Sequence, residues 1–184
     1  MHKKIGIWGF GKTGQSVLSF LFFNPDYKNS SFFIFESQQL SPEQKEQAKK
    51  HAATFVDPSL LHEFLNMCDS IIPSPGIDIS NYNEYQEKFI CELDLFAKYC
   101  TTKTIAITGS VGKTSIVTLL TELMNRSHIN SCYAGNIGVP MLDVLQQQQD
   151  YDYIVLELSS FQLEHAKHFA PTIAVITNLY ENHL

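Results

Sequence analysis

The sequence predicts an α/β fold with two parallel sheets, each organised around a glycine-rich turn between a strand and a helix. The first turn is Gly9-Phe-Gly-Lys-Thr-Gly14, and the second is Gly109-Ser-Val-Gly112, which leads into Lys113. Each turn follows a short apolar run and precedes a helical pattern, and further apolar runs alternate with helices along the chain. We therefore expect a Rossmann-like domain over residues 1–98 and an incomplete phosphate-loop domain over residues 99–184.

Composition and charge limit the class of protein. Of the 184 residues, 44% are hydrophobic and 17% are charged, which is enough apolar material for a packed core. The net charge is -6 and no run of lysines or arginines occurs, so a nucleic-acid partner is not expected. The four cysteines form no CxxC pair, which favours reduced packing residues and a cytoplasmic location.

The N-terminus carries no expected membrane or export signal. Two lysines precede an apolar stretch, but Gly9, Gly11 and Lys12 interrupt it too early for a signal peptide. The longest apolar run, residues 17–23, is too short to cross a bilayer. We therefore expect no membrane insertion.

The first domain is expected to alternate strands and helices in the order of a dinucleotide fold. Strands are predicted at residues 4–8, 31–36, 54–56 and 69–72, and helices after Gly14, after the capping box Ser41–Gln44 and after Asp57-Pro58. Glu36 ends the second strand 22 residues after Gly14, where a Rossmann unit places an acid on a ribose hydroxyl. The turn after the fourth strand, residues 73–76, lies at the sheet end where ligands bind.

The second domain repeats this alternation. We predict strands at residues 103–108, 131–134, 153–158 and 172–176, and helices at 92–98, from the glycine loop to 126, at 139–145 and at 159–169. The strand at 153–158 lacks polar alternation, which is typical of a buried parallel strand. The two domains would therefore be nucleotide-type folds in series.

The loop at residues 109–112 has the chemistry of a phosphate site. A helix N-terminus exposes unpaired N–H groups and about half a positive charge, and glycines let an anion approach that backbone. Lys113 would reach the terminal phosphates and the Thr114 hydroxyl would contact Mg²⁺. Only two residues separate Gly109 from Gly112, whereas the usual phosphate loop has four between its glycines.

Three further polar residues follow or end strands of the second domain. Glu157 stands in an apolar strand, which favours a Mg²⁺ ligand, with a buried ion pair as the alternative. His183 follows the next strand in the same way, although an isolated histidine is more often a surface residue. Asn136, between two glycines, favours a left-handed turn conformation, with a ligand contact as the second choice. His165 and His168 would share one face of a helix, where we expect a solvated surface rather than a metal site.

Taken together, these motifs resemble the Mur ligases, the ATP-dependent amide-forming enzymes of bacterial cell-wall synthesis. The matching residues are Thr108 to Thr114, Gly135 to Gly138, Leu156 to Glu164 and Asn178 to His183. The run Ser-Ser-Phe-Gln-Leu-Glu resembles the branch that joins D-glutamate to UDP-N-acetylmuramoyl-L-alanine. In that branch ATP phosphorylates the alanyl carboxylate, and the amine of D-glutamate attacks the resulting acyl phosphate.

The resemblance implies roles for individual residues. ATP would contact Gly109, Ser110, Val111, Gly112, Lys113, Thr114 and Ser115, with Lys113 steadying the β- and γ-phosphates. Thr114 and Glu157 would hold one Mg²⁺, and His183 would serve a second. Asn136, Ser159 and Gln162 would position the muramoyl-alanine end, and Lys113, Asn136 and His183 would form the catalytic set. The UDP end would contact Thr13, Glu36, Ser37, Ser74 and Gly76.

Several features depart from the family pattern. Val111 replaces a polar residue, usually asparagine, and Tyr180 and Asn182 replace a hydroxyl residue and an acid ahead of the histidine. The loss of that acid removes a negative charge near His183, which would weaken metal binding. The resemblance also implies a carbamylated lysine, a further part of the ATP site and a C-terminal domain that the given sequence does not contain. We therefore expect a fragment, with a truncated gene product as the second choice, that is inactive alone and self-associates through an unpaired sheet edge.

Two other functions stay open at this point. An NAD(P)-binding oxidoreductase would explain Gly9 to Gly14 and Glu36, but it would leave the second glycine loop and Glu157 unexplained. A non-catalytic module that binds a UDP-sugar would fit the shortened second domain. Binding of UDP, NADH and Mg·ATP distinguishes the three functions.

Overall fold

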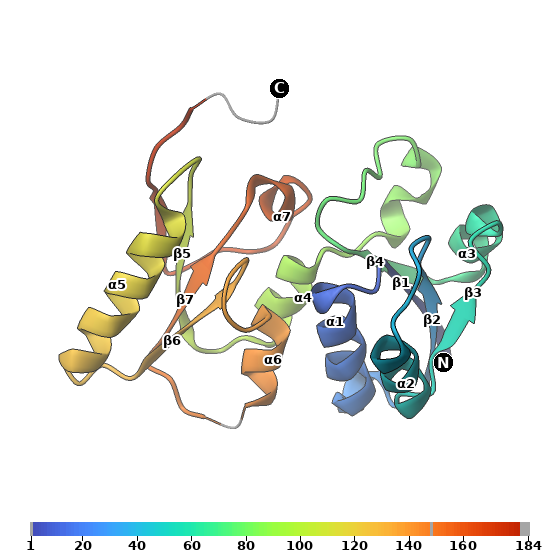
Figure 1. Cartoon of the computed structure of the whole chain (residues 1–184), viewed down its shortest axis with the longest axis horizontal. Helices are drawn as coiled ribbons and strands as arrows, with labels where there is room; N and C mark the ends of the chain where they lie inside the picture. Colours follow the sequence, from blue (N-terminus) through green and yellow to red (C-terminus); the bar gives the residue numbers. More distant parts are fainter. Residues whose placement is uncertain (1, 148, 181–184) are drawn as a thin grey trace. The chain divides into compact units, whose positions relative to one another are not determined.

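The computed structural model describes residues 2–147 and 149–180 and shows two α/β units, residues 1–92 and 93–184 (Figure 1). Each unit contains one four-stranded sheet in which every described strand pair is parallel. The α/β class predicted from the alternation of apolar runs and glycine turns is therefore confirmed. The division between the units falls at the start of α4 (Glu92–Tyr99). The boundary expected between residues 98 and 99 stays a prediction.

The first unit follows the predicted alternation. Its elements are β1 (Lys3–Trp8), α1 (Lys12–Phe23), the 3₁₀ helix η1 (Pro25–Tyr27), β2 (Ser30–Phe35), α2 (Pro42–Lys50), β3 (Thr54–Val56), α3 (Leu61–Met67), β4 (Ser70–Pro73) and the 3₁₀ helix η2 (Asn83–Lys88). The predicted capping box begins α2, because the Ser41 side chain accepts from the Gln44 N–H while the Gln44 side chain accepts from Ser41.

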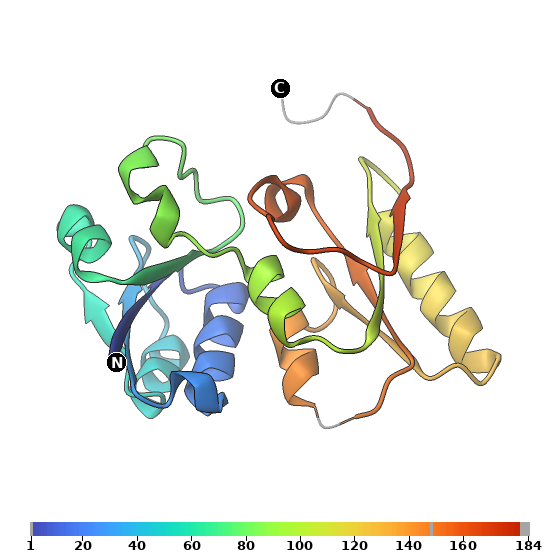
Figure 2. The ribbon, with the colours of Figure 1, turned by 180° about the vertical axis from the view of Figure 1, so that it is seen from behind.

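The strand order of the first sheet is β3-β2-β1-β4. Because parallel crossovers are right-handed, α1 and α2 cover one face and α3 the other, as Figure 2 shows from behind. The order reverses direction between β1 and β4, so the turns that follow these two strands lie side by side at the carboxyl edge. The expected UDP-binding residues are on the turns after β2 and β4, except Thr13, which is in the first turn of α1 next to the turn after β1.

Close packing fixes the first sheet against its helices. Gly6 in β1 leaves no room for a side chain, since an added Cβ would lie 2.7 Å from the Phe64 ring of α3. Trp8, Phe35 and Phe64 belong to one buried cluster, in which the Trp8 and Phe35 rings meet edge to face at 6.1 Å. Helical and strand spacing predicts that Phe20, Phe22, Phe23, Phe32, Phe33 and Phe35 are core residues. Phe20, Phe32 and Phe35 are buried and Phe33 is partly buried, but the prediction is wrong for Phe22 and Phe23, which are 39% and 64% exposed near the end of α1.

The second unit also alternates strands and helices. After α4, its elements are β5 (Lys103–Thr108), α5 (Lys113–Arg126), β6 (Ser131–Gly135), α6 (Met141–Gln146), β7 (Tyr153–Glu157), α7 (Ser160–Glu164) and β8 (Ile173–Ile176). The strand order is β6-β7-β5-β8, with α5 on one face of the sheet and α6 and α7 on the other (Figure 1). The reversal of direction lies between β5 and β7, which brings the ends of these two strands together.

Two predicted helices differ from the structure. The helix expected directly after Asp57-Pro58 begins only at Leu61, because the Asp57 carboxylate accepts from the N–H and hydroxyl of Ser59 and forms a local turn. The helix expected over residues 159–169 ends at Glu164. His168 therefore lies beyond the helix and does not share its face with His165.

A carboxylate from α4 explains the early end of α7. The Asp94 side chain accepts from the N–H groups of Lys167 (2.9 Å), His168 (2.7 Å) and Phe169 (3.0 Å). Three consecutive N–H groups that converge on one anion cannot also bond the carbonyl groups four residues earlier in a helix. A contact from a distant segment thus overrides the local helical pattern.

Candidate functional site

The predicted phosphate loop joins β5 to α5 as a tight backbone turn. Gly109 and Gly112 have φ angles of 140° and 84°, in the region that favours glycine. A Cβ at Gly109 would lie 2.2 Å from the Thr177 hydroxyl oxygen. The first backbone bond of α5 runs from the Ile116 N–H to the Gly112 carbonyl at 3.1 Å. The N–H groups of Lys113, Thr114 and Ser115 therefore precede the helical ladder, as a phosphate site requires.

The Lys113 ammonium folds back over this loop. Its Nζ donates to the Gly109 carbonyl at 2.5 Å and to the Ser110 carbonyl at 3.3 Å. The positive charge thus lies beside the start of α5, where the helix dipole also favours an anion. The two carbonyl contacts would have to be exchanged for phosphate oxygens if a nucleotide bound.

Glu157 lies at the centre of the second unit's polar cluster. Its side chain is 1% exposed, and it accepts from the Thr114 hydroxyl and from the Asn136 amide, both at 2.9 Å. Thr114 and Asn136 are themselves exposed, so the cluster lies just below the surface. The sheet register explains the convergence, because β7 pairs Glu157 with Ile107 of β5 on one side and Gly135 of β6 on the other.

The Glu157 carboxylate fits a cation site better than an ion pair. Among residues 2–147 and 149–180, its side-chain partners are the two neutral groups named above. A buried carboxylate without a positive partner is costly, and oxygen atoms from Glu and Thr are ligands that Mg²⁺ accepts. Within the same described ranges, no group of three or more His, Cys, Asp and Glu residues has the spacing of a protein-only metal site. Any cation here would need other ligands as well.

The loop that carries Asn136 differs from its predicted conformation. The left-handed geometry expected at Asn136 is wrong, because the positive φ angles occur at Gly135 (104°) and Gly138 (71°) instead. A Cβ at Gly135 would lie 2.4 Å from the Glu157 carbonyl oxygen. The Asn136 N–H donates to that carbonyl at 2.9 Å. The flanking glycines thus adopt the positive φ angles, which they do without steric cost, and the Asn136 side chain is directed at Glu157.

Ser159 and Gln162 pair with each other at the start of α7. The Ser159 hydroxyl accepts from the Gln162 N–H at 3.3 Å, and the Gln162 side chain accepts from the Ser159 N–H at 3.0 Å. This reciprocal capping box fixes the entry to α7, two residues after Glu157. The muramoyl-alanine contacts expected of both residues stay predictions.

In the first unit, the turns after β1, β2 and β4 meet at the sheet edge. The Ser74 hydroxyl donates to the Gly9 carbonyl at 3.2 Å. Glu36 accepts from the Phe10 N–H at 2.7 Å and from the Gln38 N–H at 2.9 Å, so its carboxylate braces the glycine turn. The other expected contacts, Thr13, Ser37 and Gly76, lie in the first turn of α1, after β2 and after β4.

Part of the predicted site lies outside the described residues. His183, expected to serve a second Mg²⁺, and Asn182, which departs from the family pattern, are both in this category. Val111, the other departure in the loop, is 54% exposed. Its side chain therefore contributes little packing to the loop.

Sequence reasoning gave no role to Asn178 or Thr177. Both residues follow β8 and bond the backbone of Val111 in the phosphate loop. The sequence signal was the position of Asn178 directly after a strand of the same sheet, next to the phosphate-loop strand. A strand end at that position can reach the loop, but the bonding partners depend on backbone geometry.

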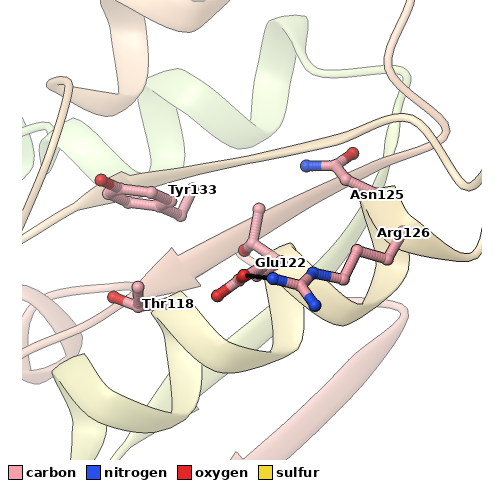
Figure 3. Close-up of a pocket in the computed structure, with 6 residues that line it drawn as sticks. Thr118, Glu122, Asn125, Arg126 and Tyr133 are labelled. Atoms are coloured by element: carbon pink, nitrogen blue, oxygen red, sulfur yellow. Dashed lines mark hydrogen bonds and ion pairs between the residues drawn. The ribbon is translucent and has the colours of Figure 1, made fainter.

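A hollow elsewhere in this unit takes no part in the predicted site. It has a volume of about 500 Å³ and lies between α5 and β6 (Figure 3). Its lining residues are Thr118, Thr121, Glu122, Asn125, Arg126 and Tyr133. Two of these residues, Glu122 and Arg126, form an exposed ion pair, and no predicted site residue within the described ranges lines the hollow.

Among the described helices, none is long and apolar enough to cross a membrane.

Two family models match the chain. A model of the MurD N-terminal domain matches residues 4–82, and a model of the Mur ligase middle domain matches residues 107–184. Each match falls within one of the two units, and together they include all of the residues predicted to bind UDP or ATP.

Curated relatives match over nearly the full length of the chain. It is 33% identical to the UDP-N-acetylmuramoylalanine–D-glutamate ligase of Thermosipho melanesiensis, covering 98% of this chain and 43% of the relative. It is 34% identical to the Coxiella burnetii ligase of the same name, covering 97% of this chain and 40% of the relative. The chain thus spans about two fifths of the length of these relatives.

Solved structures share the fold. A UDP-N-acetylmuramate:L-alanyl-γ-D-glutamyl-meso-diaminopimelate ligase from Neisseria meningitides aligns with a TM-score of 0.55 at 16% identity, covering 100% of this chain and 62% of that one. A UDP-N-acetylmuramate–alanine ligase from Thermotoga maritima aligns with a TM-score of 0.53 at 19% identity, covering 99% and 43%. At these identities the likeness concerns the fold alone.

Proposed function

The chain belongs to the Mur ligase family, and we propose that it supplies two nucleotide sites to an ATP-dependent ligase. The first unit would bind the UDP end of UDP-N-acetylmuramoyl-L-alanine. The second would bind ATP with Mg²⁺, and the protein would join D-glutamate to the alanyl carboxylate in the cytoplasm. The relatives that match this chain carry the name of that activity.

The observation that carries this proposal is the buried Glu157 carboxylate beside the phosphate loop. Its Oε2 lies 2.9 Å from the Thr114 hydroxyl, which is one residue past the lysine of the loop. Two oxygen atoms of the kind that Mg²⁺ accepts thus lie beside the start of α5, whose first N–H groups have no backbone partner among the described residues, and beside the loop lysine. Such a set neutralises the charge of a triphosphate and its metal.

The residues present suit phosphoryl transfer, which depends on position and charge more than on covalent chemistry. Lys113 would exchange its loop carbonyl contacts for the β- and γ-phosphates, and Thr114 with Glu157 would hold Mg²⁺. When bound, the ion would neutralise charge on the phosphate oxygens. Asn136, held by Glu157, would orient the acceptor carboxylate that attacks the γ-phosphorus. ADP would leave, and the amine of D-glutamate would displace phosphate from the acyl phosphate.

The two alternatives are not favoured. An oxidoreductase would need the glycine turn of the first unit for a dinucleotide, yet both family models and the curated relatives are of ligases. A UDP-sugar module without ATP chemistry would leave the Thr114–Glu157 cluster without a purpose. Self-association through the β8 edge stays a prediction.

Because the chain spans part of its relatives' length, binding rather than turnover tests the proposal. Titration calorimetry with Mg·ATP should show binding to the wild-type chain and at least about tenfold weaker binding to Lys113→Ala. Lys167→Ala removes an exposed positive charge from the same unit and should leave the affinity unchanged. No binding of Mg·ATP at millimolar concentration, or equal losses in both variants, would overturn the ATP-site assignment.

A further inference from the structure

The segment that follows β8 holds the phosphate loop through side-chain and backbone bonds. The Asn178 amide oxygen accepts from the Val111 N–H at 3.0 Å, and its Nδ2 donates to the Val111 carbonyl at 2.9 Å. The Thr177 hydroxyl donates to the same carbonyl at 3.0 Å. The Ser110 hydroxyl bonds both backbone groups of Tyr180, at 2.9 and 3.0 Å.

The Asn178 side chain acts as a substitute for a neighbouring backbone. A primary amide offers one acceptor and two donors, so it can pair with both polar groups of a single peptide unit. The backbone at Val111 depends on such a partner to stay in place. The Val111 side chain is 54% exposed and contributes little packing, and the glycines with positive φ on either side of Ser110 and Val111 do not restrict the backbone. Without Asn178 the centre of the loop would lose two of its backbone bonds.

This pairing also decides which N–H groups remain for an anion. Both N–H groups at the front of the loop bond Asn178. The Val111 N–H donates to its side-chain oxygen, and the Ser110 N–H donates to its backbone carbonyl at 3.3 Å. The N–H groups of Lys113, Thr114 and Ser115 remain at the start of α5, because the helical ladder begins with Ile116. The bonds to Asn178 thus direct the front of the loop away from the ligand.

We propose that Asn178 is a positioning residue for the phosphate loop: its amide holds Val111 so that the start of α5 faces the phosphates. This inference rests on the proposed ATP site. It assigns to Asn178 no contact with nucleotide, metal or acceptor. It also explains how a loop with only two residues between its glycines is kept in one shape, since the neighbouring strand end supplies the missing partners.

The same unit offers a matched control. Asn125, near the other end of α5, forms the same kind of pair with Ser131, accepting from its N–H at 2.8 Å and donating to its carbonyl at 2.9 Å. Figure 3 shows Asn125 at the hollow between α5 and β6. Asn125 is near the C-terminal end of α5, whereas the loop precedes Lys113 at its N-terminal end. Asn125→Ala therefore removes two equivalent bonds, together with a longer one from the Ser131 hydroxyl at 3.3 Å, and leaves the loop intact.

Amide hydrogen exchange of the nucleotide-free chain tests the structural half. Exchange at Val111 should be at least about tenfold faster in Asn178→Ala than in the wild type, and unchanged in Asn125→Ala. Asn178→Asp keeps an acceptor for the Val111 N–H but loses the donor to the Val111 carbonyl. Its exchange rate at Val111 should therefore lie between those of the wild type and Asn178→Ala. Unchanged exchange at Val111 in Asn178→Ala would overturn the inference.

Calorimetry with Mg·ATP and with UDP tests the functional half. Asn178→Ala should bind Mg·ATP about tenfold more weakly, and Asn125→Ala should match the wild type at a comparable loss of folding stability. Both variants should bind UDP as the wild type does. Faster exchange with unchanged Mg·ATP affinity would overturn the positioning role while the ATP site stands. Absence of Mg·ATP binding to the wild type would instead refute the proposed function and the positioning role together, leaving only the exchange result on loop structure.

Discussion

Gly11 and Gly14 lie in the same glycine turn, yet an added methyl group would meet different surroundings at each. A Cβ at Gly14 would lie 2.1 Å from the Gly9 carbonyl oxygen, whereas a Cβ at Gly11 would meet no atom of the described residues within 4 Å. Gly14→Ala should therefore destabilise the first unit by about 1–3 kcal/mol, because backbone rather than a movable side chain blocks the space. Gly11→Ala should cost less than about 1 kcal/mol.

Urea unfolding followed by the fluorescence of Trp8 measures this difference. Trp8 is the only tryptophan of the chain and is buried beside the turn, so it reports on the first unit. Equal losses of unfolding free energy in Gly14→Ala and Gly11→Ala would contradict the explanation that the close approach of α1 to the Gly9 backbone requires a glycine at position 14.

Glu157→Gln separates the charge of the buried carboxylate from its shape. The amide retains an acceptor for Asn136, and the Thr114 hydroxyl can rotate to accept where it now donates. The fold should therefore persist, but the affinity for Mg·ATP should fall about tenfold while the affinity for ATP without Mg²⁺ changes little.

Calorimetry with and without Mg²⁺ measures the effect of Glu157→Gln, with Glu164→Gln as the control. Glu164 is exposed at the end of α7, so neutralising it tests the general effect of one lost charge. If Glu157→Gln bound ATP equally well in both conditions and as tightly as the wild type binds Mg·ATP, Glu157 would not be a metal ligand.

At the scale of elements, Asp94 ties α4 to the connection between α7 and β8. Its carboxylate accepts from three consecutive N–H groups, those of residues 167–169. Asp94→Asn removes the charge and replaces one acceptor oxygen with a donor. We expect a loss of about 1.5–3 kcal/mol in the unfolding free energy of the second unit, since hydrogen bonds to charged groups lie in that range.

Chemical denaturation and amide exchange at residues 167–169 measure the effect of Asp94→Asn. Asp150→Asn is a suitable control because Asp150 is exposed in the same unit. Exchange at residues 167–169 should rise in Asp94→Asn alone. A stability loss without faster exchange there would place the role of Asp94 elsewhere.

The strands were predictable because short apolar runs end at glycine turns, and the runs 54–56 and 103–108 have the bounds of β3 and β5. The convergence of Thr114, Asn136 and Glu157 was also predictable, since parallel strands bring their carboxyl ends to one edge. The predicted end of the helix after Ser159 was wrong because the carboxylate of Asp94, more than 70 residues away, accepts from the N–H groups of Lys167 and His168. Asn178 was missed for a similar reason, since its partner is the backbone of Val111.

For the whole molecule, one buried thiol (Cys68) and one partly buried thiol (Cys132) couple the stability of the two units to pH. Burial raises the pKa of Cys68 in the first unit to about 12 and that of Cys132 in the second to about 11, from an ordinary value of 9.0. Above pH 9 the unfolded thiols ionise while the folded ones keep their protons. Stability is therefore fully present below pH 9 and falls as the pH rises toward 11 and 12.

Denaturation at pH 8 and pH 11 tests this coupling. Cys68→Ala should be less stable than the wild type at pH 8, because it leaves a cavity beneath Gly6, but its first unit should lose less stability between the two pH values. Comparison with the wild type cancels the titration of tyrosines and lysines. A parallel loss in both proteins would contradict the contribution of Cys68.

The two proposed ligands are anions, and the chain carries a net charge of -6, so long-range attraction cannot account for their binding. The groups at each proposed site must therefore supply the attraction, and the two sites are in different units.

In an NMR titration, UDP should shift the amides of residues 9–14, 36–38 and 74–76. Mg·ATP should shift those of residues 109–115 together with Asn136 and Glu157. Both sets of shifts should persist in 150 mM salt. The Debye length there is about 8 Å, so salt screens long-range attraction but not contacts at hydrogen-bond distance. NADH serves as the control, since the oxidoreductase alternative predicts that it, and not UDP, shifts the turn at Gly9 to Gly14. Shifts spread over surface lysines and lost in salt would reveal unspecific anion binding and contradict both sites.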